Sequence, residues 1–118
     1  MALVLLAAGC GGETEHSLSK TRSCLESDHV RIGGKLDFVA STAPAGAFVA
    51  HLDDNFVTIV FGENDSNADE LEAAYHRFAF SNVREGLPDV LRRDRNVVML
   101  WHKHPADAAL STVTGCLE

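Results

Sequence analysis

Two short runs of apolar residues near the middle of the chain alternate in a way that predicts a β-hairpin. The first run is AFVAHL over residues 47–52, and the second is FVTIVFG over residues 56–62. A chain reversal at Asp54–Asn55 is expected, because Asp and Asn tolerate the positive φ that a two-residue loop needs. This register puts the apolar sets on one face, with Leu52, Ala50 and Phe48 opposite Val57, Ile59 and Phe61. The other face is less polar than an open face should be, so we expect it to be partly covered.

Apolar residues at spacings of three and four predict helices on both sides of this hairpin. One is expected over Ser17–Glu26 and another over Ala68–Phe80, where Asn67 and Glu70 have the spacing of a capping box. A last helix is expected to begin at Pro105, since proline is favoured in the first turn.

A third strand is predicted over Asn96–Lys103, because Val97–Trp101 are apolar without interruption and therefore indicate an interior position. Residues 36–41 fit either a short strand or a helical turn, and Leu87–Pro88 suggests another helical turn that continues to Arg93. The basic stretch Leu91–Arg95 is expected to be a solvated turn, with contact to anionic lipid head groups as the alternative.

The predicted order of elements is helix, strand, strand, helix, strand, helix, within one domain over residues 17–118. A right-handed helical crossover from the second strand would place the third strand parallel to it and beside the first. The predicted fold class is therefore α+β, with an open three-stranded sheet of order 2-1-3 and its helices on one face. This arrangement resembles a ferredoxin-like fold reduced by one strand.

The formal net charge of −7 argues against general nucleic-acid binding, which needs a basic surface. No apolar run approaches the roughly 20 residues that span a bilayer. The chain has no Gly-x-Ser-x-Gly elbow and no glycine-rich phosphate loop with its lysine. We therefore expect a binding or accessory role rather than an enzyme, with a small enzyme whose site is unidentified as the third alternative.

The chain begins with MALVLLAAGC, an apolar run that ends in Cys10. The segment Leu6–Cys10 resembles the lipobox of bacterial envelope lipoproteins, although Ala7 stands where leucine is usual. The resemblance covers these ten residues. It implies that residues 1–9 are a signal segment, that Cys10 carries a lipid anchor, and that residues 10–16 form a tether. The expected location is the cell membrane, outside the cytoplasm. The alternative is a short buried segment with an inert thiol.

Lipidation of Cys10 leaves two of the three cysteines, Cys24 and Cys116. They lie in matching settings, Ser-Cys-Leu-Glu and Gly-Cys-Leu-Glu, beside the apolar stripes of the first and last predicted helices. An exported protein meets an oxidising environment, so we predict that the two form a disulfide. Two buried free thiols are the alternative.

Two histidines two residues apart, His102 and His104, would point the same way from a strand. If the third strand lies beside the first, His51 comes within reach of them. Zinc or copper would need three or four such ligands, so a metal-binding module is the second functional alternative. Surface histidines at a strand end are the ordinary explanation, and we expect no cofactor. The main expectation is an exported, lipid-anchored envelope protein with a binding role, whose partner the sequence does not name.

Overall fold

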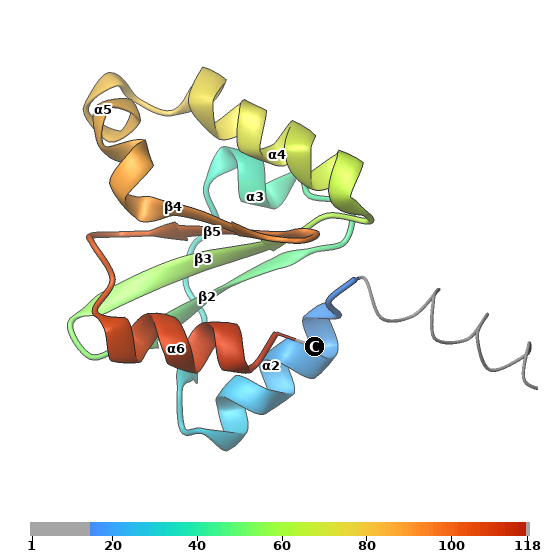
Figure 1. The fold of residues 1–118 in the computed structure, drawn as a ribbon, viewed down its shortest axis with the longest axis vertical. Helices are drawn as coiled ribbons and strands as arrows, with labels where there is room; N and C mark the ends of the chain where they lie inside the picture. The colour runs from blue at the N-terminus through green and yellow to red at the C-terminus, as the bar shows by residue number, and fades with distance from the viewer. Residues whose placement is uncertain (1–14, 118) are drawn as a thin grey trace, which may run out of the picture.

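A five-stranded antiparallel sheet forms the centre of the protein (Figure 1). The computed structural model describes residues 15–117. In this part the strands lie in the order β1-β2-β3-β5-β4, with bounds β1 Arg31–Ile32, β2 Ala47–Leu52, β3 Asn55–Phe61, β4 Leu91–Asp94 and β5 Val97–Trp101. The helices are α2 Leu18–Ser27, α3 Phe38–Ser41, α4 Asp65–Phe78, α5 Ser81–Val90 and α6 Asp107–Gly115.

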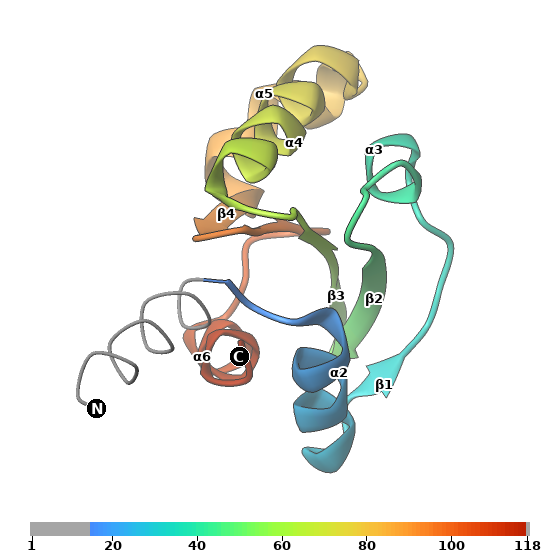
Figure 2. The same cartoon turned by 90° about the vertical axis from the view of Figure 1, so that its right-hand side faces the viewer.

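Helices cover both faces of this sheet: α2 and α6 lie on one face, and α3, α4 and α5 lie on the other (Figure 2). Each face has its own apolar core. Against α2 and α6 the sheet buries residues such as Val57, Ile59 and Trp101, while against α3 and α4 it buries Val60 and Val98. The central strands β3 and β5 are therefore apolar on both sides, as expected for strands enclosed between two layers.

The α+β class is correct, but the predicted three-stranded sheet of order 2-1-3 with helices on one face is wrong. Residues expected to form a solvated turn are the edge strand β4, which pairs antiparallel with β5. The helical crossover from β3 leads to β4, and a tight turn then reverses the chain. As a result β5 enters between β3 and β4 and runs antiparallel to both. Because the prediction did not recognise β4 as a strand, it gave β5 the wrong direction and placed it beside β2 instead of between β3 and β4.

The hairpin of β2 and β3 turns one residue earlier than predicted, at Asp53 and Asp54, where Asp53 adopts a φ of 57°. Leu52 consequently pairs with Asn55. This changes the register by two residues, an even number, so the apolar sets still share one face. Asn55 is buried and exchanges side-chain hydrogen bonds with the backbone of Lys103, donating at 2.9 Å and accepting at 3.1 Å. Its side chain therefore holds the segment after β5 and does not form the turn.

The predicted helices are present with shifted ends. Helix α4 is capped by the side chain of Asn64, which accepts from the backbone N–H of Asn67 at 2.8 Å, so the expected cap at Asn67 is wrong. Helix α6 begins at Asp107, two residues after Pro105. The turn expected around Pro88 is instead the last part of the ten-residue helix α5.

A disulfide joins Cys24 of α2 to Cys116 at the end of α6, which confirms the predicted pairing. The two Cα atoms are 5.5 Å apart, within the usual range for such a bond. Because both helices pack on the same face of the sheet, the bond closes that layer between segments 92 positions apart in sequence.

The buried side chain of Asn96 fixes the place where the N-terminal segment joins the domain. The His16 N–H donates to Asn96 Oδ1 at 2.7 Å, and Asn96 Nδ2 donates to the carbonyls of His16 and Gly62 at 3.0 and 2.9 Å. The His16 ring also lies 3.1 Å from a carboxylate oxygen of Asp94. The proposed signal segment and Cys10 lie outside the described residues. Among the described helices, none has the length and apolarity that crossing a membrane requires.

Candidate functional site

A cleft of about 660 Å³ opens on the sheet face that carries α3, α4 and α5. Its floor is made by Phe56 and Thr58 of β3, Leu100 of β5, and His102 just after β5. One wall is α5 and the other is the segment 35–37, which leads into α3. The cleft exists because α3 and α4 cover the other end of this face, over Val60 and Val98.

The most exposed part of the floor is aromatic. The rings of Phe56 and His102 stack with centroids 4.5 Å apart and planes inclined by 14°. Phe56 is 36% exposed, although it lies in a strand of the central sheet. Leu100 and Val83 add apolar surface beside this pair. Nearly parallel rings at this separation lie face to face, so the floor offers aromatic edges to a bound molecule.

Both carboxylates that line the cleft have partners within the protein. The Tyr75 hydroxyl donates to the two oxygens of Asp37 at 3.0 and 2.9 Å, and the Ala40 N–H donates to one of them at 2.8 Å. Burial, together with the Asp37 charge and hydrogen bond, raises the pKa of Tyr75 well above its usual range, so Tyr75 remains a donor. The second carboxylate, Asp89, lies 2.6 Å from Nδ1 of His104.

The lysine side chains at the cleft have fewer partners within the protein than the carboxylates have. Within the described residues, the Lys35 ammonium forms no hydrogen bond or ion pair. Lys103 is paired with Asp54 at 2.9 Å, and this pair is exposed to solvent. A hydrogen bond and the positive charge of Lys103 lower the pKa of Asp54. The cleft therefore presents an unpaired ammonium at one wall, beside an aromatic floor.

The structure does not bring together the three histidines considered as metal ligands. Because β5 lies beside β3 and not beside β2, β3 separates His51 from His102, by roughly 10 Å across two strand spacings. His51 Nε2 lies 2.7 Å from the Gly33 carbonyl, and His104 pairs with Asp89. Within residues 15–117, the potential ligands close enough to share one ion are Cys24, Asp28 and Cys116. The two sulfurs of that set are bonded to each other, so they offer no thiolates.

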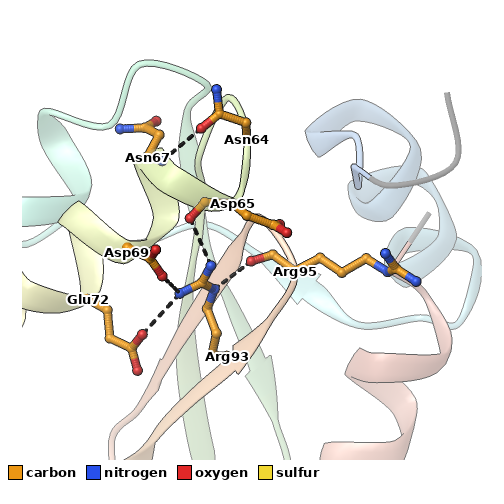
Figure 3. Close-up of polar contacts among 7 residues, drawn as sticks. All are labelled: Asn64, Asp65, Asn67, Asp69, Glu72, Arg93 and Arg95. Atoms are coloured by element: carbon orange, nitrogen blue, oxygen red, sulfur yellow. Dashed lines mark hydrogen bonds and ion pairs between the residues drawn. The ribbon is translucent and has the colours of Figure 1, made fainter. Parts of the chain in front are cut away.

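Arg93, in the basic stretch before β5, is likewise committed to the fold (Figure 3). Nη1 of Arg93 lies 2.7 Å from Asp69 Oδ1 and 3.1 Å from Glu72 Oε1, and Nη2 donates to the Asp65 carbonyl at 2.9 Å. Burial alone would lower the pKa of Arg93, but the hydrogen bonds and charges of Asp69 and Glu72 outweigh it and raise the pKa. Arg93 thus fastens β4 to α4, which leaves its charge little scope to meet a lipid surface.

Comparison of the chain with models of known protein families, with curated proteins and with solved structures gives no match. The sequence prediction missed the cleft because its lining comes from segments far apart in the chain. One local signal could have found it, the large aromatic Phe56 on the more polar face of the hairpin. The expectation that this face is partly covered agrees with the buried Thr58 and Val60.

Proposed function

We propose that this protein is exported, anchored to the cell membrane by a lipid on Cys10, and binds a small organic molecule in the cleft. The cleft is the observation that carries the proposal. Its volume of about 660 Å³ falls in the range of small-molecule sites, about 300–1,000 Å³. Its apolar floor with a few polar groups at the rim is typical of such sites. Binding is proposed over catalysis because the chain has no Gly-x-Ser-x-Gly elbow and no glycine-rich phosphate loop with its lysine.

The position of the N-terminal segment suits an anchored receptor. His16 is held at the end of the sheet where Phe61 pairs with Val97. The cleft begins at Phe56, five residues away in β3 (61 − 56), or about 17 Å along the strand. Cys10 and His16 are six residue steps apart (16 − 10), which reach about 20 Å when extended. A lipid on Cys10 would thus keep the domain near the membrane, with the cleft at the other end of β3 from the tether.

Metabolic labelling with an alkyne fatty acid tests the anchor. The protein is expressed in a bacterium together with its genomic upstream sequence. Wild-type protein should incorporate the label and sediment with membranes, whereas Cys10→Ser should do neither and should keep its fold. Wild-type protein that remains unlabelled and soluble would refute the anchor.

Filling the cleft tests the binding site. A Cβ at Gly86 would meet no atom of another part of the fold within 4 Å, and the same holds for Gly115 in α6. Gly86 lines the cleft, whereas Gly115 lies on the opposite face of the sheet. Small aromatic compounds are screened by NMR against the full chain carrying Cys10→Ser. Those that shift the amide signals of Phe56 and Leu100 should lose binding in Gly86→Leu and retain it in Gly115→Leu. Equal binding to both variants would rule out the cleft.

A further inference from the structure

We infer that the ligand of the cleft is a small organic acid, with a planar aromatic body and one carboxylate. This inference rests on the proposed binding function and adds the chemical class of the ligand. Three features of the cleft carry it: the Asp37 carboxylate is satisfied within the protein, the Lys35 ammonium has no partner among the described residues, and the floor contains a stacked pair of rings.

The hydrogen bonds that the cleft carboxylates already make argue against a cationic ligand. The Tyr75 hydroxyl lies 3.0 and 2.9 Å from the two oxygens of Asp37, which also accepts from the Ala40 N–H and so caps α3. A ligand cation would have to compete with these contacts. Oδ1 of Asp89 is engaged by His104 at 2.6 Å. Among the carboxylate oxygens of the cleft in the described residues, this leaves only Oδ2 of Asp89 without a hydrogen bond.

The unpaired donors favour an anion. Lys35 stands on the wall formed by residues 35–37 and has no acceptor within the described residues. The His102 ring, across the floor, is engaged by stacking on Phe56, and no hydrogen bond of its nitrogens is seen in that same part of the chain. A carboxylate between them would gain charge-assisted hydrogen bonds, which are stronger than neutral ones.

The floor selects the body of the ligand. Phe56 and His102 stack on each other and present ring edges, and aromatic rings pack well against such edges in an edge-to-face geometry. Leu100 and Val83 border it and would exclude water from a bound ring. The volume of about 660 Å³ accommodates a one- or two-ring acid. An aliphatic diacid would leave this aromatic surface unused.

The test compares three probes that share one ring system: 1-naphthoate, 1-naphthalenemethanol and 1-naphthylmethylamine. Amide NMR titrations are run on the full chain carrying Cys10→Ser, with the disulfide intact. Naphthoate should bind most tightly, the alcohol more weakly and the amine most weakly. The amide signals that naphthoate shifts most should be those of Phe56, Leu100 and His102.

Two charge variants identify the group responsible. Lys35→Gln should weaken naphthoate binding by about two- to fivefold, the range for an exposed ion pair, and should leave binding of the alcohol unchanged. Lys20→Gln is the matched control, because it removes the same charge from α2 on the opposite face of the sheet. It should leave naphthoate affinity unchanged.

The outcomes separate this inference from the proposed function. If the three probes bind equally and Gly86→Leu abolishes all of them, the cleft is a binding site but the preference for an acid is wrong. Preferential binding of the amine, or equal losses in Lys35→Gln and Lys20→Gln, would also overturn the inference. If no probe shifts the amide signals of the cleft residues, both this inference and the proposed binding site are wrong.

Discussion

Removing the disulfide by the double substitution Cys24→Ala and Cys116→Ala should strongly destabilise the domain. The bond closes a loop of 92 positions, for which chain entropy predicts about 4.6 kcal/mol of stabilisation. Measured losses in small secreted domains are about 2–5 kcal/mol. This is a large share of the roughly 5–15 kcal/mol that a domain has in total.

The two joined helices have limited stability of their own, which is why the loss should be large. Helix α6 has no side-chain cap at its N-terminus, and it buries Ala109 and Val113 against the sheet. Helix α2 is capped by Ser17 but buries only Thr21 and Leu25 within its ten residues. Helices this short are marginal in isolation and depend on tertiary contacts. Without the bond, we expect both to detach more readily.

Urea denaturation followed by circular dichroism measures the effect, with Cys10→Ser as the parent of every variant so that no third thiol exchanges. The double alanine variant should lose about 2–5 kcal/mol of unfolding free energy, and reductant should shift the midpoint of the parent but not that of the variant. Thiol titration of the denatured, unreduced parent should find no free thiol. Two free thiols, or an unfolding free energy unchanged by the substitutions, would refute the reasoning.

The remaining predictions concern buried polar side chains. Since folding raises the pKa of Tyr75 above its ordinary value of 10.0, the folded state keeps a proton that the unfolded state loses, so stability should fall as pH rises above about 10. Tyr75 is the sole tyrosine, so phenolate absorbance should appear only on unfolding; a titration near pH 10 in the folded protein would contradict this. Asn96→Ala should lower unfolding free energy by about 1–3 kcal/mol and speed amide exchange at His16, whereas unchanged exchange at His16 would show that Asn96 does not hold that segment.

The local sequence pattern was sufficient to predict those helices and strands that are defined by their own residues. The alternation in β2 and β3 determined which side chains share a face, and this survived an error of two residues in register because the period of a strand is two. Spacings of three and four located α2 and α4 within a few residues. The contexts of Cys24 and Cys116, together with the expected export to an oxidising environment, predicted their bond.

Tertiary structure decided the features that depend on distant partners. Leu91–Asp94 has little strand pattern of its own, and it is a strand because β5 pairs with it and because Arg93 reaches Asp69, 24 residues earlier. Asn55, expected in the turn, serves instead as a contact to Lys103, 48 residues later.

The candidate site belongs to this second group. Phe56, Val83 and Lys35 come from three separate segments, and no local pattern relates them. They meet because α3 and α4 cover only one end of the sheet face, which depends on how the sheet is ordered. The sequence determines the elements through periodicities of a few residues, whereas the sheet order and the cleft follow from packing between segments that periodicity cannot connect.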